Sequence, residues 1–160
     1  MSPEEQATLQ RLLTEQRVLA LAVVVEGAPY AGLLPFAVYP DLSAALIHAS
    51  TLARHTAGLY EGALFSLLIH QPDEPDADPL QIPRVTLQGE VHLLAKGSPD
   101  YAAGRDLYTH KFPTSQQTFD LGDFNLYRLQ FKDGRFVAGF GRAYNLTADV
   151  LRRVAEQRHR

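Results

Sequence analysis

The chain of 160 residues contains no cysteine. This absence excludes disulfides, thiolate nucleophiles, iron–sulfur clusters and zinc sites built on cysteine. Proteins without disulfides are typical of a reducing compartment, so we expect a cytoplasmic protein. The first ten residues, MSPEEQATLQ, are acidic and polar, unlike a signal peptide. No apolar run approaches the roughly 18–20 residues that cross a bilayer, so we expect no membrane partner.

Sequence motifs of the common catalytic centres are missing too. The six histidines form no HxH, HxxxH or HExxH pattern, and there is neither a GxSxG nor a Walker sequence. We therefore expect no metal site and assign no catalytic residue. The net charge is −3, whereas domains that bind nucleic acid are usually basic, so we expect no nucleic-acid partner.

The residues that are present indicate a single globular domain. Apolar residues make up 46% of the chain and charged residues 21%. Ser2 with Glu5 forms a capping box at the start of a first helix, and Thr147 caps a last one. The domain divides into an N-terminal helix, a β-rich body and a C-terminal helix, over residues 1–16, 17–144 and 147–160.

Seven apolar segments predict strands, most of them hairpin neighbours. They cover residues 18–25, 30–39, 44–49, 64–70, 83–94, 124–131 and 135–140, the last two forming a hairpin around Asp133-Gly134. The first segment is apolar throughout, which predicts burial on both faces. Pro35 requires an edge or a bulge in the second. A further helix is expected over residues 98–111. The pattern is mainly β and favours an antiparallel barrel or curled sheet with flanking helices.

One segment joins a strand, a basic pair and a short helix. Arg54 and His55 fall in the first turn of that helix, where the helix dipole disfavours cations by roughly 0.3–1 kcal/mol. A bound anion would resolve the conflict, held by helix N–H groups, the Ser50 or Thr51 hydroxyl and the Arg54 guanidinium. A solvated arginine without a ligand is the alternative. His48, on the preceding strand, either faces a pocket or is half exposed.

Several segments, taken in order, resemble the pyridoxamine 5′-phosphate oxidase-like superfamily of FMN-binding split barrels. They are Pro29-Tyr30 with Leu34-Pro35-Phe36-Ala37, Ser50 to Thr56, Ser66 to Ile69, Asp78 to Gly89 and Gly122 to Leu129. Within this superfamily the haem-utilisation (HugZ-like) branch is the most similar, on the segment Val137-x-Gly139-Phe140-Gly141-Arg142-Ala143. The likeness covers residues 17–144.

The resemblance implies a homodimer of six-stranded antiparallel split β-barrels, with FMN at the subunit interface and oxidoreductase chemistry. Carried onto this chain, Arg54 and His55 would hold the flavin phosphate beside Ser50 and Thr51. The other residues that the resemblance places near the flavin ring are Pro35, Phe36, His48, Ala49 and Arg84.

Alternatives to an FMN protein follow from the same resemblance. Gly32 stands where the group often has Ser or Arg, and His55 where oxidases usually have Lys, so weaker flavin binding is expected. Deazaflavin could take the place of FMN. The haem-utilisation branch implies haem binding or degradation, with His159 as the axial ligand. The remaining hypothesis is a cofactor-free dimeric barrel that binds a protein or a small ligand.

Overall fold

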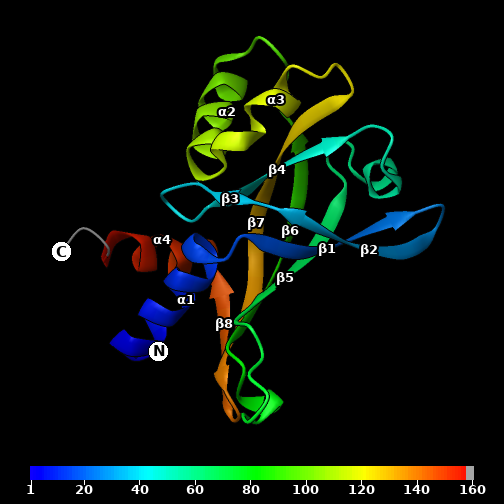
Figure 1. Cartoon of the computed structure of the whole chain (residues 1–160). Coiled ribbons are helices and arrows are strands. Elements are labelled where there is room, and N and C mark those ends of the chain that lie inside the picture. Colours follow the sequence, from blue (N-terminus) through cyan, green and yellow to red (C-terminus); the bar gives the residue numbers. More distant parts are fainter. Residues whose placement is uncertain (158–160) are drawn as a thin grey trace.

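A strongly curled antiparallel sheet forms the centre of the molecule, with helices packed against its ends and sides (Figure 1). The computed structural model describes residues 1–157. In this range, none of the helices has both the length and the apolar character needed to cross a membrane.

Of the four α-helices in residues 1–157, three begin where local signals predicted. They are α1 (Pro3–Glu15), α2 (Pro99–Lys111), the single-turn α3 (Gln116–Phe119) and α4 (Ala148–Glu156). In α1 the Ser2 hydroxyl accepts a hydrogen bond from the Glu5 N–H at 3.2 Å, and the Glu5 carboxylate accepts one from the Ser2 N–H at 2.7 Å. Ser98 and Thr147 cap α2 and α4 with their hydroxyls. Each cap satisfies N–H groups that have no partner inside the helix. Only α3 was not predicted.

The sheet has eight strands. They are β1 (Val18–Val25), β2 (Ala28–Pro35), β3 (Ala37–Val38), β4 (Ala44–Ser50), β5 (Leu64–His70), β6 (Arg84–Leu93), β7 (Phe124–Gly139) and β8 (Arg142–Thr147). Their order is β2-β1-β5-β6-β7-β4-β3, with β8 paired to β7. The strands at the two ends of this order, β2 and β3, follow each other in the chain and are separated only by Phe36. The sheet therefore curls back on itself. With β2 and β3 counted as one strand and β8 as an addition, this is the predicted six-stranded split barrel.

The prediction that β1 is buried on both faces was wrong. Its buried side chains alternate, and they are Leu19, Leu21, Val23 and Val25. On the other face Val24 is 58% exposed. That face is equally apolar, yet nothing in residues 1–157 covers it fully.

The predicted hairpin at Asp133-Gly134 was also wrong, because β7 runs through it without a turn. A two-residue hairpin turn with Gly in this position needs a positive φ, and Gly134 does not have one. The glycine instead allows the backbones of β6 and β7 to approach closely, because a Cβ at this position would lie 2.3 Å from the Thr86 carbonyl oxygen of β6. The chain reverses later, at Gly141, where φ is +76°.

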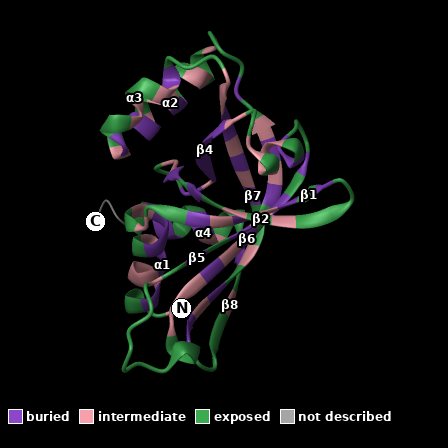
Figure 2. Ribbon diagram, turned by 45° about the vertical axis from the view of Figure 1, so that its right-hand side comes forward, coloured by how far each residue is buried: buried purple, intermediate pink, exposed green. Residues whose placement is uncertain are grey.

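Two buried clusters hold the fold together, and they lie on opposite faces of β4 and β7 (Figure 2). The larger cluster fills the inside of the curled sheet and includes Leu9 and Leu13 of α1 and Leu151 of α4. The smaller one packs α2 and α3 on the outer face, and includes Leu46, Leu126, Tyr108 and Phe119. The second cluster places α2 and α3 beside the end of β4.

Candidate cofactor site

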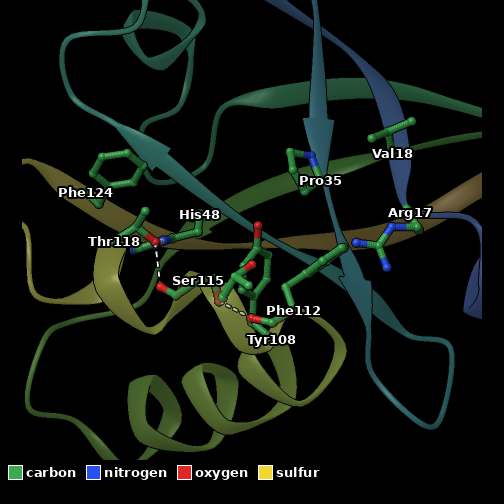
Figure 3. A pocket seen from close by; sticks show the side chains of 10 residues that line it. Arg17, Val18, Pro35, His48, Tyr108, Phe112, Ser115, Thr118 and Phe124 are labelled. Atoms are coloured by element: carbon green, nitrogen blue, oxygen red, sulfur yellow. Dashed lines mark hydrogen bonds between the residues drawn. The ribbon is translucent and has the colours of Figure 1, made fainter.

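A pocket of about 470 Å³ opens where β1, β2 and β4 meet α2 and the short helices after it (Figure 3). Its size is within the usual range for small-molecule and cofactor sites. Pro35 and His48, both predicted near the cofactor, lie in its wall. The residues on which the argument below depends are Arg17, Pro35, His48, Tyr108, Phe112 and Thr118.

His48 is packed among aromatic rings at the bottom of this pocket. It is 7% exposed, its ring stacks on Phe119 with centroids 3.8 Å apart, and Tyr108 meets it edge-on at 5.9 Å. Burial, followed by the positive charges of Lys96 and Arg105, lowers the pKa of His48 from 6.5 to about 4. The imidazole is therefore neutral at physiological pH.

The two ring nitrogens of His48 differ in their surroundings. Nδ1 lies 3.2 Å from the Thr118 hydroxyl, which donates a hydrogen bond to the Ser115 carbonyl oxygen at 2.7 Å. Nε2 is enclosed and has no hydrogen-bond partner among the described residues. One nitrogen is therefore held by the protein, and the other is buried without a polar contact.

Two cations, Arg17 and Lys111, lie near each other, and within residues 1–157 neither forms an ion pair. Arg17 lines this pocket, and Lys111 lines a different one. The Arg17 guanidinium lies 4.9 Å from the Phe112 ring centroid. Lys111 Nζ lies 4.3 Å from the Phe36 ring centroid and donates to the Gln16 carbonyl oxygen at 2.6 Å. Burial, and then the charge of Arg17, lowers the pKa of Lys111 from 10.5 to about 8. A negatively charged ligand group would relieve this repulsion.

The predicted phosphate cradle at Ser50 and Thr51 is bonded to an acidic residue. The Ser50 hydroxyl donates to Asp123 Oδ2 at 2.7 Å, and the Thr51 N–H donates to the Asp123 carbonyl oxygen at 2.7 Å. A short helix follows and ends at Gly58, as predicted, but the expected side-chain cap was wrong. Instead, a five-residue 3₁₀ helix, η1 (Arg54–Gly58), begins after Ala53 with no side-chain cap. It is too short for the dipole argument, which rests on many aligned peptide units.

Arg54 and His55 of η1 point to different surroundings. Arg54 lies over the Tyr30 ring of β2 at 5.3 Å and forms no ion pair within the described part of the chain. His55 packs against Gly32, where a Cβ would lie 3.4 Å from its Nδ1. Burial lowers the pKa of His55, which disfavours the charged form that would bind a phosphate. Gly32 and His55, the two departures from the family pattern, are therefore in contact with each other.

The remaining predicted residues lie away from the pocket. Phe36 and Ala49 point into the main core. Arg84 of β6 pairs with Val137, near the C-terminal end of β7. Ser50 pairs with Phe124, at the other end of the same strand. His159 lies outside the described residues.

Sequence reasoning missed the residues that α2, α3 and the residues before β1 bring to the pocket. They are Arg17, Tyr108, Phe112, Thr118 and Phe119. Tyr108 and Phe112 have the i, i+4 spacing of one helix face, and that spacing could have revealed an aromatic surface. Thr118 follows a proline that indicated only the end of a helix, so nothing local pointed to it. No three metal-ligating side chains come together in residues 1–157.

Known structures share this fold over nearly the whole chain. A haem-binding protein from Mycobacterium smegmatis superposes with a TM-score of 0.81 and 24% identity, covering 96% of this chain and 62% of that one. A second structure is a Clostridium acetobutylicum protein related to general stress protein 26 and described as of the pyridoxine phosphate oxidase family. It superposes with a TM-score of 0.68 and 14% identity, covering 94% of this chain and 99% of that one. The chain has the split-barrel fold of the pyridoxamine 5′-phosphate oxidase-like proteins. The resemblance found in the sequence is confirmed at the level of the fold.

Other comparisons differ in the cofactor that they name. The split-barrel chain is 35% identical over 119 residues to the non-canonical haem oxygenase HOZ of Arabidopsis thaliana, a chloroplastic protein. That match covers 74% of this chain and 35% of HOZ, so the chain spans about a third of its relative's length. A FAD-binding protein from Mesorhizobium loti has a TM-score of 0.59 and 15% identity, covering 78% of this chain and 86% of that one. No family model matches the chain.

Proposed function

We propose that this split-barrel protein binds haem in the pocket beside His48. The observation that carries the proposal is the pocket of about 470 Å³, whose wall combines a neutral histidine with the rings of Tyr108, Phe112 and Phe124. Imidazole nitrogen is a common axial ligand of haem iron. Arg17 adds positive charge in the pocket wall, where a haem propionate would be stabilised. Haem, when bound, supplies iron chemistry with oxygen, and the chain supplies the apolar cavity and the orientation.

Similarity to haem proteins supports the same proposal. The Mycobacterium smegmatis structure is described as haem-binding and HOZ as a haem oxygenase. By contrast, a flavin phosphate at Ser50 would have to displace the Asp123 carboxylate, and burial lowers the pKa of His55, which disfavours its charged form. Haem therefore suits the side chains of this site better than FMN does.

The test of this proposal is a titration with haemin followed by absorption near 400 nm. We expect saturable uptake by the native protein. Thr114, an exposed residue of the pocket wall, offers a way to fill the cavity. The Thr114→Trp variant should bind haemin at least about tenfold more weakly, a loss of ~1.4 kcal/mol. Gln117→Trp, an exposed position outside the pocket lining, is the matched control and should bind as the native protein does. Equal affinity in all three proteins would contradict the proposal.

Flavin binding is a second candidate function because Arg54 remains free for a phosphate. Its guanidinium lies over Tyr30, and within residues 1–157 no carboxylate is in ion-pair range. The FAD-binding neighbour with the same fold supports this candidate. The same titration with FMN distinguishes the two, since bound FMN changes its fluorescence. FMN uptake without haemin uptake would favour the flavin protein.

We also propose that the chain is a homodimer, joined through the uncovered face of β1, β2 and β5. This apolar sheet face carries Val18, Ala20, Val24, Leu33, Leu64 and Leu68. Ala20 pairs with Leu33 on one side and with Leu68 on the other, so the apolar residues are contiguous. Exposed apolar patches of this kind usually mark an interface. Val18 and Pro35 belong to one end of this face and also line the pocket, so a second copy would lie beside the cofactor site.

Leu33, which is 71% exposed, provides the test of the dimer. In a symmetric interface, Leu33→Lys places two charges in the contact. We therefore expect the dissociation constant of the dimer to rise at least about 100-fold, which corresponds to ~2.7 kcal/mol. Sedimentation equilibrium measures the change. Leu80→Lys is the control, because Leu80 is 56% exposed but lies far along the chain in the loop before β6. A native monomer, or a Leu33→Lys dimer as stable as the control, would exclude this interface.

A further inference from the structure

The hydroxyl of Tyr108 is a hydrogen-bond donor that the described fold does not use. The residue is 4% exposed and lines the cofactor pocket, and Figure 3 shows its hydroxyl pointing into the cavity. The oxygen has no hydrogen-bond partner in residues 1–157, and it is not among the polar atoms that the fold encloses. Burial alone raises the pKa of Tyr108 to about 12. The phenol is therefore protonated and open to the cavity, and its hydrogen has no acceptor.

The other hydroxyls in the pocket wall are already satisfied. Thr118 donates to the Ser115 carbonyl oxygen at 2.7 Å, and Ser115 Oγ donates to the Phe112 carbonyl oxygen at 2.6 Å. Thr114 is exposed at the rim, where water satisfies its hydroxyl. A tyrosine hydroxyl that lies in the interior usually finds a partner, because an unpaired buried donor is costly. Tyr108 is therefore the deep donor that remains for a ligand.

The charge of the pocket wall indicates what kind of acceptor this donor meets. The wall contains the cation Arg17 and no carboxylate among the described residues. Within residues 1–157 no acid forms an ion pair with Arg17. The Arg17 guanidinium and the Tyr108 ring lie 4.9 Å and 5.1 Å from the centroid of the same Phe112 ring. An anionic oxygen in this part of the pocket would accept from both donors, and such charge-assisted hydrogen bonds are strong.

We propose that Tyr108 and Arg17 bind the same carboxylate of the ligand, so that the pocket selects apolar molecules that carry a carboxylate. The proposal rests on the haem-binding function and names the chemical feature by which haem is chosen, since haem joins an apolar ring system to two propionates. Phe112, between the two donors, offers the apolar contact. Because the hydroxyl is already open to the cavity, binding requires no change in the packing of α2.

The experiment compares the affinity for haemin with that for haemin dimethyl ester, in which both carboxylates are neutral. Tyr108→Phe removes only the hydroxyl and keeps the ring packed against His48 and Phe112. The native protein should prefer haemin. In Tyr108→Phe the dissociation constant for haemin should rise at least about tenfold while that for the ester stays nearly unchanged. Tyr101→Phe is the matched control on the same helix, outside the pocket lining, and should keep the native preference.

A double-mutant cycle tests whether Arg17 and Tyr108 act on one group. Arg17→Gln should also reduce the preference for haemin, and the double variant should lose less than the product of the two single losses. Circular dichroism checks that each variant is folded. The proposal is overturned if the native protein binds haemin and the ester equally, if Tyr108→Phe weakens both or neither, or if the two losses multiply. Failure of the haem-binding function itself is distinct, because the native protein would then take up neither compound.

Discussion

The Gly89→Ala variant is expected to lose the barrel fold or at least about 4 kcal/mol of its free energy of unfolding. A Cβ at position 89 would lie 1.8 Å from the Gln130 carbonyl oxygen on β7. At this point the β6–β7 register shifts, since Gln88 pairs with Asp133 and Gly89 with Phe131. The backbone of β7 therefore occupies the space that a side chain at position 89 would need. Both strands pass through the middle of the sheet, so neither can move without breaking pairs on its other side.

Chemical denaturation of soluble variants measures this effect. Gly122→Ala is the matched control, because nothing lies within 4 Å of a Cβ there and its φ is not positive. Its free energy of unfolding should remain within about 0.5 kcal/mol of the native value. If Gly89→Ala were as stable as Gly122→Ala, β6 and β7 would not approach each other as the structure shows.

The two glycines of this crossing show what local sequence can and cannot predict. Gly89 falls in the strand alternation of residues 83–94, so the strand was predicted, but the bulge was not. Gly134 was interpreted as a turn because Asp-Gly is a strong local turn signal. The residue is instead required by a strand that is distant in sequence, at Thr86. A glycine has the same appearance in a sequence whether it serves a turn or a close approach.

Elements whose causes are local were predicted well. The boundaries of α1 follow from its capping box, and residues 64–70 correspond to β5. The apolar run of β1 correctly indicated a strand, but not that one of its faces is left uncovered by the described chain. Composition tells how apolar a face is, and only the packing of the other elements tells whether this chain covers it.

The candidate site was predicted in part, for a related reason. Pro35 and His48 were found because their segments resemble a family in order and spacing. Thr118 and Tyr108 were missed because their contacts with His48 span 60 to 70 residues of sequence and depend on how α2 and α3 fold over β4. The resemblance also suggested a basic cradle at Ser50, where the structure shows a bond to Asp123. A resemblance to a family can thus locate a site without giving the charge of its surroundings.

The haem-free protein should become less stable as pH falls from about 6.5 to about 4, and His48 should cause much of this loss. Its pKa is about 4 in the folded chain and near 6.5 when unfolded. Between these values the unfolded chain binds a proton that the folded chain does not, so stability falls with pH. Above pH 6.5 His48 therefore makes its full contribution to the free energy of unfolding. This contribution is lost as the pH falls through about 4. For a residue only 7% exposed, the difference of about 2.5 pKa units corresponds to roughly 3 kcal/mol.

Thermal or urea unfolding of the haem-free protein between pH 4 and pH 7 measures this dependence. Replacing the imidazole in His48→Phe removes the titrating group but keeps the stack on Phe119, so most of the loss in this window should disappear. His110→Gln, at an exposed position of α2, should retain the native slope. Lys96 and Arg105, whose charges add to the effect of burial, are unchanged in both variants. Equal slopes in the two variants would mean that His48 is solvated or protonated in the folded protein, which would contradict the enclosed, neutral imidazole that the structure shows.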